Sequence, residues 1–280
     1  MSGYVATRHR IDLGDHVLGL LVLMPRDAHG PVPGVLWAHG GGYCTGMASM
    51  AHFSRPADLA RTGRAVVVCP DYRLAPAHPY PAGLLDCYAA LLWLQEHAEG
   101  LGVASDQLFV GGESAGGGLA AALCLLARDL GEVAIAYQMP LYPMLDCRDT
   151  ATSCDNHGHI WNTRRNHSAW RLYLGGLREA ARVPPYASPA QEEDLTGLPA
   201  AYTFVCEGEP FLAETLDYVQ RLRDAGVDAH CDVYHGDVHA FDMMLPWRDE
   251  SQLAVRRFLE RFDQATARCH AEQPRCAHPS

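Results

Sequence analysis

The sequence of 280 residues is 48% hydrophobic and has a formal net charge of −11 at pH 7. Its length fits one large domain and its apolar fraction suffices for a sizeable core, which excludes a disordered or fibrous chain. The acidic balance argues against nucleic acid or an anionic membrane surface as a partner, and the absence of lysine among the 22 basic residues excludes a lysine Schiff base or a P-loop.

Apolar runs and helical patterns alternate along the chain. A hairpin is expected at 4–13 and 17–24, followed by strands at 33–40, 65–74, 108–112, 134–142, 201–208 and 229–236. Helices are expected at 52–62, 81–97, 114–130, 211–225 and 249–268. Short apolar strands that alternate with helices indicate an α/β fold, with a mostly parallel sheet covered by helices on both faces. We therefore expect residues 1–280 to form a single α/β domain.

The segment 147–185 interrupts this alternation. It is polar, and it contains Trp161, Arg164, Arg165 and Trp170. A long insertion after a strand of a regular sheet predicts a cap or lid over a site. The alternative is a surface excursion without a function.

The ends of the chain and its ten cysteines show no targeting or metal-binding pattern. The first residues lack the apolar segment of a signal peptide, and no apolar run reaches the roughly 18 residues of a membrane span, so we expect a cytoplasmic protein. The cysteines are scattered and no CxxC pair occurs. Residues 269–280 are expected to be a frayed polar tail, in preference to a metal site formed by Cys269, His270, Cys276 and His278.

The strongest motif is Gly112-Glu113-Ser114-Ala115-Gly116, which fits the pattern G-x-S-x-G. It follows an apolar strand and opens a helix rich in alanine and leucine. In that context the glycines allow a sharp turn that presents a serine hydroxyl at the edge of the sheet, and the start of the helix supplies unpaired N–H groups. Ser114 is therefore the expected nucleophile.

A serine hydroxyl needs a base to take its proton, and in this arrangement a carboxylate and then a histidine follow the serine along the chain. His239, in the loop after the last predicted strand, is the expected base, with His235 as the alternative. Glu209 is the expected carboxylate and Glu207 the alternative, because Pro210 fixes the turn that follows Glu209. A glutamate can hold the histidine tautomer and stabilise the imidazolium as an aspartate does.

An oxyanion intermediate needs preorganised N–H donors. The run His39-Gly40-Gly41-Gly42 follows a predicted strand, and a backbone without side chains can approach a substrate closely. The N–H groups of Gly40, Gly41, Gly42 and Ala115 are therefore the expected oxyanion hole. A merely flexible glycine loop is the alternative.

Four blocks of sequence occur in a specific order: HGGGY at 39–43, DYRLAPAHPYPA at 71–82, GESAGGG at 112–118, and EPFLAE at 209–214 with HAF at 239–241. From about residue 33 to 262 the chain resembles the hormone-sensitive-lipase-like esterases, or bacterial family IV, of the α/β-hydrolase superfamily. The resemblance implies an α/β-hydrolase fold and a carboxylesterase that acts on short-acyl esters. It also implies supporting roles beside the site for His39, Asp71, Tyr72, Arg73 and Glu113.

The chain departs from the family pattern in three places. It has Glu-Pro-Phe at 209–211 where the family usually has Asp-Pro-Leu, and His-Ala-Phe at 239–241 where the family usually has His-Gly-Phe. Only 38 residues precede His39, fewer than in relatives, whose N-terminal residues form part of the cap. We therefore expect a reduced N-terminal cap and an active site that is either more open or covered by a partner subunit. Homodimers are common among the relatives, and we expect one here.

The expected reaction is two-step acyl transfer on a small-molecule ester, which requires no metal and no organic cofactor. The same triad would serve a formamidase or a lactone or carbamate hydrolase. A ligand-binding receptor on a hydrolase scaffold is disfavoured because the triad is retained, and a metalloenzyme because the sequence lacks HExxH. Bulky side chains that could narrow the pocket are Tyr43, Trp161 and Phe241.

Overall fold

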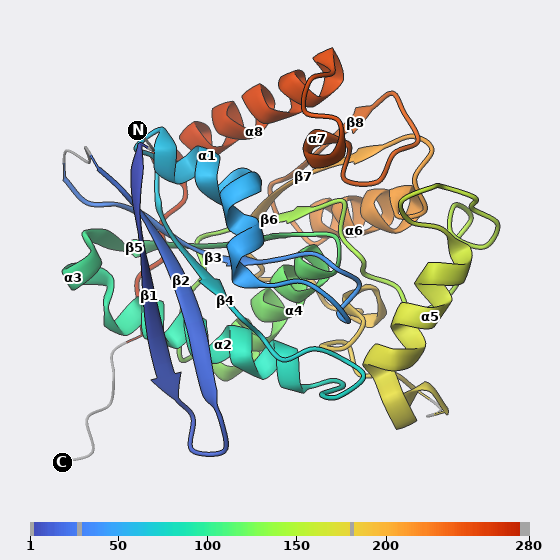
Figure 1. Ribbon diagram of the computed structural model, residues 1–280, viewed down its shortest axis with the longest axis horizontal. Helices are drawn as coiled ribbons and strands as arrows, with labels where there is room; N and C mark the ends of the chain where they lie inside the picture. The colour runs from blue at the N-terminus through green and yellow to red at the C-terminus, as the bar shows by residue number, and fades with distance from the viewer. Residues whose placement is uncertain (1–2, 27–29, 180–181, 275–280) are drawn as a thin grey trace.

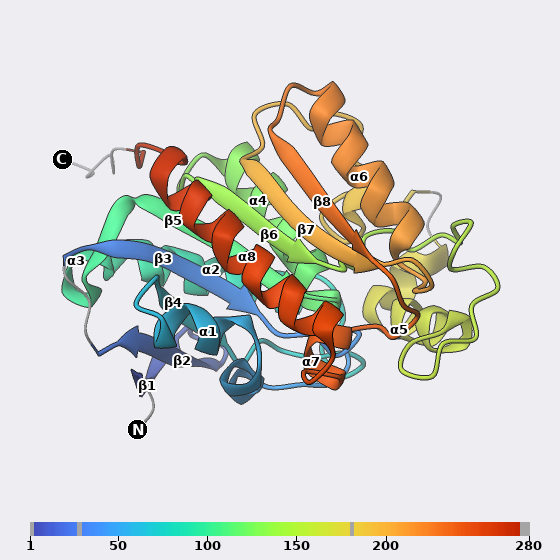
Figure 2. The same ribbon diagram turned by 90° about the horizontal axis from the view of Figure 1, so that it is seen from above.

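The fold is built on one eight-stranded sheet, which Figures 1 and 2 show between two layers of helices. The computed structural model describes residues 3–26, 30–179 and 182–274. In chain order the strands are β1 (Tyr4–Asp12), β2 (Val17–Pro25), β3 (Val32–Ala38), β4 (Val66–Pro70), β5 (Val103–Glu113), β6 (Tyr137–Leu141), β7 (Ala200–Cys206) and β8 (Ala229–Tyr234).

The order of the strands across the sheet is β1-β2-β4-β3-β5-β6-β7-β8. The predicted N-terminal hairpin is present, because β1 pairs with β2 in antiparallel register. β2 is also antiparallel to β4, and all further neighbouring pairs are parallel. This confirms the predicted mostly parallel α/β sheet. The carboxyl ends of the parallel strands meet at one edge, where α/β proteins place their sites.

The α-helices are α1 (Arg55–Arg61), α2 (Ala82–Glu96), α3 (Ala98–Leu101), α4 (Ala115–Leu130), α5 (Thr163–Leu174), α6 (Leu212–Asp224), α7 (Phe241–Met244) and α8 (Asp249–Arg268), and the 3-10 helices are η1 (Ala48–Phe53), η2 (Gly175–Glu179) and η3 (Pro189–Gln191). The prediction of one helix over 52–62 is wrong at its start. The backbone is extended at Ser54, and α1 begins only at Arg55. Pro56 explains the break, because proline lacks the N–H that a continuing helix would use.

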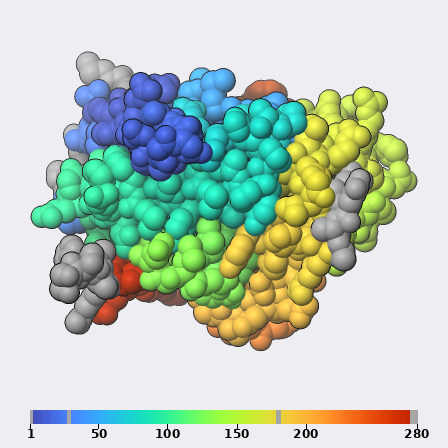
Figure 3. Space-filling view, turned by 90° about the horizontal axis from the view of Figure 1, so that it is seen from below, coloured from blue at the N-terminus to red at the C-terminus, as the bar shows by residue number. Residues whose placement is uncertain are grey.

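Residues along the central strands of the sheet alternate between two buried cores. In β3, Val35 and Trp37 face the core under α1 and α8, whereas Leu36 faces the core under α2, α4 and α6. Both faces are covered, which explains why the strands appear in the sequence as continuous apolar runs. Figure 3 shows from outside the side of the sheet that α2, α4 and α6 cover. There, residues of α2 in teal lie beside residues of the insertion in yellow.

The insertion 147–185 contains α5 and η2, which Figure 2 shows beyond the carboxyl ends of the strands. Two buried side chains of α5, Trp170 and Tyr173, pack against Tyr43 in the loop after β3, with ring centroids 5.5 and 3.9 Å from that of Tyr43. The backbone N–H of Tyr80 donates to the carbonyl of Tyr173 at 2.8 Å. This contact supports the prediction that the insertion is a cap.

Part of the predicted frayed tail is fastened to the domain. His270 Nδ1 lies 2.8 Å from a carboxylate oxygen of Asp106, and Gln273 Nε2 donates to the carbonyl of Ala134 at 2.9 Å. Cys276 and His278 of the alternative metal site lie outside the described residues. Within the described part of the chain, no group of three or more metal-ligating side chains occurs, and no helix is long and apolar enough to span a membrane.

Candidate active site

Ser114 lies at the turn between β5 and α4, with a φ of 56° and a ψ of −118°. A residue with a side chain rarely adopts this conformation, so the surrounding backbone must hold it in place. The backbone N–H of Ser114 donates to the carbonyl of Leu141 at 3.0 Å. A Cβ atom on Gly112 would lie 2.3 Å from the carbonyl oxygen of Gly116, and one on Gly116 would lie 2.0 Å from that of Ala38. These contacts explain why the turn needs both glycines.

The three expected catalytic side chains meet at the carboxyl edge of the sheet. His239 Nε2, from the loop after β8, lies 2.8 Å from Ser114 Oγ. On the other side of the imidazole ring, Nδ1 is hydrogen-bonded to Oε2 of Glu209, which follows β7. Glu209 is fully buried, and its Oε1 accepts a 2.8 Å hydrogen bond from the N–H of Cys206. Nδ1 therefore donates to the carboxylate, and Nε2 is left to accept the proton of the serine.

The two alternatives for the base and the acid lie on the surface and contact each other. His235 Nδ1 is 2.9 Å from Glu207 Oε2, with side chains that are 89% and 59% exposed. Neither residue contacts Ser114 or His239. The geometry therefore supports His239 and Glu209 over His235 and Glu207.

The glycine loop after β3 lies beside Ser114. Gly41 and Gly42 have φ values of 123° and 60°, which favour glycine, and a Cβ on Gly42 would lie 2.3 Å from a ring atom of Trp161. Among the described residues, none accepts a backbone hydrogen bond from the N–H of Gly40, Gly41 or Gly42. Ala115 is the first residue of α4, where an N–H also has no partner within the helix. These four N–H groups are thus available to an oxyanion.

Two tyrosines, Tyr72 and Tyr43, connect this loop to neighbouring segments. The ring of His39 stacks on that of Tyr72 at a centroid distance of 4.2 Å, and the Tyr72 hydroxyl donates to the His39 carbonyl at 2.8 Å. Burial lowers the pKa of His39, so the ring stays neutral beside the loop. The Tyr43 hydroxyl donates to the carbonyl of Met144 at 2.8 Å, which connects the loop to the segment after β6.

Asp71 and Arg73, the other expected supporting residues, fix neighbouring segments rather than the triad itself. Asp71 Oδ1 accepts a 2.6 Å hydrogen bond from the N–H of Ala48 at the start of η1. Arg73 Nη2 donates to Oδ1 of the fully buried Asp86 at 2.9 Å. Both contacts hold loops that surround the glycine run.

Glu113 belongs to a buried charged cluster behind the turn. Its Oε2 accepts a 2.6 Å hydrogen bond from Trp37 Nε1. Burial raises the pKa of Glu113 to about 7, and the charge of Asp242 adds to the rise, whereas hydrogen bonds from Ser54 and Trp37 and the charge of Arg55 oppose it. Arg55 Nε lies 3.5 Å from Asp242 Oδ2. Sequence patterns gave no signal for Arg55 or Asp242, because a buried ion pair between distant segments has no local motif.

A cavity of about 240 Å³ opens at Ser114. Besides the glycine loop, Ser114, Glu113 and His239, the residues that line it are mostly apolar: Met50, Tyr142, Ile160, Trp161, Ala240, Met243 and Met244. Trp161 of the insertion 147–185 therefore lines the pocket. Tyr43 and Phe241 do not appear among the described lining residues: Tyr43 packs under the cap, and Phe241 packs on Phe204 with ring centroids 5.8 Å apart. No sequence motif marks the methionines that line the cavity, because an apolar residue in a loop gives no local sign of whether it lines a site.

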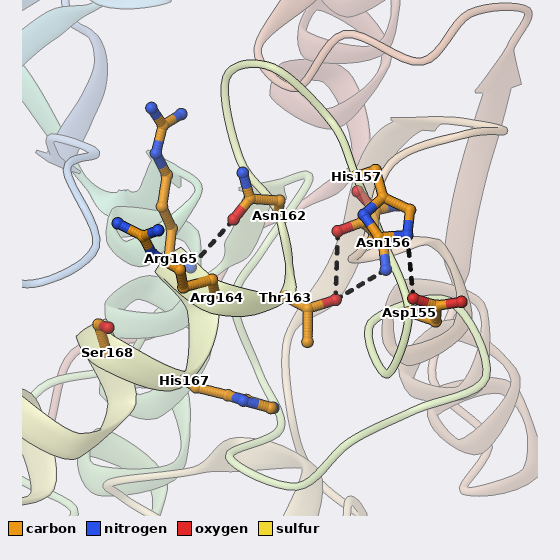
Figure 4. A pocket seen from close by; sticks show the side chains of 9 residues that line it. All are labelled: Asp155, Asn156, His157, Asn162, Thr163, Arg164, Arg165, His167 and Ser168. Atoms are coloured by element: carbon orange, nitrogen blue, oxygen red, sulfur yellow. Dashed lines mark hydrogen bonds and ion pairs between the residues drawn. The ribbon is translucent and has the colours of Figure 1, made fainter.

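A larger cavity of about 760 Å³ lies within the insertion 147–185 itself. Figure 4 shows that its lining residues are polar and come from one stretch of the insertion, with Asn162 accepting from the N–H of Arg165 and His157 beside Asp155. No triad or glycine-loop residue lines it. We therefore assign the candidate active site to the smaller cavity.

Comparison with known proteins agrees with this architecture. The profile of a family described as alpha/beta hydrolase fold matches residues 35–243. The esterase LipI and the carboxylesterase NlhH, both from Mycobacterium tuberculosis, are 34% and 33% identical over 72% and 77% of this chain. The chain spans 63% of the length of LipI and 69% of that of NlhH. A solved structure described as a bacterial heroin esterase has a TM-score of 0.89 and 34% identity, and the alignment covers 94% of this chain and 85% of that one.

The sheet order and the strand–helix turn at Ser114 define an α/β-hydrolase type of protein. The matched region includes the glycine loop and all three candidate catalytic residues. The chain belongs to the α/β-hydrolase-fold family, in the hormone-sensitive-lipase-like branch that the four sequence blocks indicate.

Proposed function

We propose that this protein is a serine carboxylesterase that hydrolyses small, short-acyl esters through Ser114, His239 and Glu209. The observation that carries the proposal is the continuous chain of hydrogen bonds from Glu209 through His239 to Ser114, with 2.8 Å between His239 Nε2 and Ser114 Oγ. The printed names of LipI and NlhH support the ester class of substrate. The small apolar cavity of about 240 Å³ supports a small neutral substrate.

In the first step, Ser114 Oγ forms a bond to the ester carbonyl carbon while its proton passes to His239 Nε2. The negative charge of the tetrahedral intermediate falls on the carbonyl oxygen, where the N–H groups of the glycine loop and of Ala115 can donate to it. Glu209 stabilises the imidazolium that forms. The carbon–oxygen bond to the alcohol then breaks, and the leaving oxygen takes the proton from His239.

In the second step, water replaces the alcohol. His239 takes a proton from the water molecule as its oxygen attacks the acyl-enzyme carbonyl, and it returns that proton to Ser114 Oγ when the acid leaves. The alcohol leaves with the proton that came from Ser114, and Ser114 regains a proton from water, so the cycle balances without an oxidant, a metal or an organic cofactor.

The test is the turnover of a p-nitrophenyl ester series from acetate to palmitate by the wild type and by Ser114→Ala. We expect the short esters to be cleaved fastest and Ser114→Ala to lose turnover by several orders of magnitude. Preference for the long-chain esters would contradict the short-acyl part of the proposal. If the wild type cleaves none of the series, the proposal fails, and lactones, carbamates and formamides are the substrates to assay next on the same triad.

A further inference from the structure

The buried cluster behind the active site joins three segments that are far apart in sequence. Glu113 directly precedes Ser114 at the end of β5, Asp242 lies three residues after His239 in α7, and Arg55 is the first residue of α1. Arg55 is 5% exposed, Glu113 is 4% exposed and Asp242 is 1% exposed. A cluster of one guanidinium and two carboxyl groups in such surroundings costs free energy of folding, so a stability role is a poor explanation for it.

Arg55 holds the central place in this cluster. Its Nε atom lies 3.5 Å from Asp242 Oδ2, and its Nη2 atom lies 3.2 Å from Asp58 Oδ2 at the start of its own helix. The charges of both Arg55 and Asp242 act on Glu113. The Arg55 guanidinium is therefore a counter-ion for two carboxyl groups. Glu113 lies beside the turn of Ser114, and Asp242 lies beside the loop of His239.

The segment that directly follows His239 is short and begins with an unusual backbone conformation. Ala240 follows His239 with a φ of 58°, a conformation that a residue with a Cβ rarely adopts, and α7 spans only Phe241–Met244. A short helix after a strained residue gains little stability of its own. The 3.5 Å contact between Arg55 Nε and Asp242 Oδ2 joins α1 to α7 as an ion pair without a hydrogen bond, and Ser251 Oγ donates to the Phe241 carbonyl at 3.1 Å.

We propose that Arg55 and Asp242 are positioning residues for the reaction: their buried ion pair holds the His239 loop against the turn of Ser114, and the Asp242 carboxylate stabilises the imidazolium form of His239. The inference rests on the proposed function of the triad. Neither residue is among the described residues that line the cavity at Ser114, so both would act through the histidine loop. Among the described residues, the other titratable groups that face the pair are Asp58 from α1, Glu113 from β5, Tyr142 after β6, Cys206 from β7 and His239 itself. Tyr72 and Cys69 face Glu113 in turn.

The decisive variant is Asp242→Asn, which keeps the size of the side chain and removes its charge. Because it leaves the buried Arg55 guanidinium without the Asp242 charge, the melting temperature should fall, so kcat is measured per folded protein well below the thermal transition. We expect kcat for p-nitrophenyl acetate to fall roughly ten- to a hundredfold with KM little changed, because a misplaced base slows the chemical step. We also expect the acid limb of the kcat/KM profile to move to lower pH, because an anion that favours the protonated imidazole is gone.

Asp58→Asn is the matched control. It removes the other carboxylate partner of Arg55, on the more exposed side of the guanidinium, and leaves the Arg55–Asp242 pair in place. Its kcat and its pH profile should equal those of the wild type. Arg55→Lys keeps the positive charge but loses the planar guanidinium with its several N–H donors. Its kcat should lie between those of the wild type and Asp242→Asn.

Three results separate the possibilities. If Asp242→Asn matches the wild type in kcat and in the acid limb, the positioning role is wrong and the proposed function stands. If kcat falls only in proportion to a loss of folded protein, with the limb unmoved, the pair is merely structural and the inference is again overturned. If the wild type itself hydrolyses no ester, the proposed function and this inference fall together.

Discussion

Ser114 and His239 lie 125 positions apart in the sequence, yet the Oγ atom of the first is 2.8 Å from the Nε2 atom of the second. The parallel sheet produces this contact, because the turn after β5 and the loop after β8 both leave its carboxyl edge. Four predictions test how the groups around this contact contribute.

Glu209→Gln should lower kcat roughly 10⁴-fold, because an amide neither fixes the tautomer of His239 nor stabilises the imidazolium. The measurement is steady-state hydrolysis of p-nitrophenyl acetate. Glu207→Gln is the control, since the Glu207 side chain is hydrogen-bonded to the exposed His235 and should leave kcat within twofold of the wild type. Equal effects of the two substitutions would contradict the assignment of Glu209.

Gly42→Ala should lower kcat about a hundredfold, because its new Cβ would lie 2.3 Å from the Trp161 ring and would displace a loop that donates to the oxyanion. Adding Trp161→Ala should restore part of the loss, since the clash disappears while the strain of a φ of 60° remains. Gly100→Ala, where nothing lies within 4 Å of the new Cβ, is the neutral control. Failure of the double variant to recover any activity would mean that Trp161 does not determine the effect.

Trp161→Ala alone should widen the cavity toward the cap. We expect the ratio of kcat/KM for octanoate to that for acetate to rise roughly tenfold, because several methylene groups gain room. The p-nitrophenyl series measures this ratio directly. Trp247→Ala is the matched control, since Trp247 is 69% exposed and does not line the cavity. An unchanged chain-length profile would show that Trp161 does not limit the acyl group.

Glu113→Gln should change how stability depends on pH. The pKa of Glu113 rises from the ordinary 4.5 to about 7 in the folded chain, so between those values the folded state binds more protons than the unfolded state. The wild type therefore loses stability through this residue as pH rises from about 4.5 to 7, by up to about 3 kcal/mol at 1.36 kcal/mol per pH unit. Melting temperatures of both proteins over this range should diverge in favour of Glu113→Gln as pH rises, and parallel curves would contradict the prediction.

Much of the fold follows from local patterns in the sequence. Apolar runs located the central strands because both faces of the sheet are buried there, and the helix expected at about 249–268 agrees with α8. The predicted helix over 52–62 missed the break at Ser54, because the helical pattern of residues shows no interruption there. Pro56 is the one local mark of the start of α1.

The candidate site was predictable where chemistry requires a local motif. Ser114 and the glycine loop have fixed neighbours, and Glu209 and His239 follow strands in a fixed order. Arg55, Asp242 and the methionines that line the cavity have no such signature. Their roles depend on which loops meet at the sheet edge, and that follows only from the assembled fold.

The most direct test of the central claim is covalent labelling with diisopropyl fluorophosphate, followed by peptide mass spectrometry. If Ser114 is the nucleophile, its Oγ forms a bond to phosphorus, fluoride leaves, and the proton passes to His239. We predict one stoichiometric adduct on the peptide that contains Ser114, with esterase activity lost in parallel and no adduct on Ser114→Ala. An adduct on another residue, or full turnover by the labelled protein, would contradict the account.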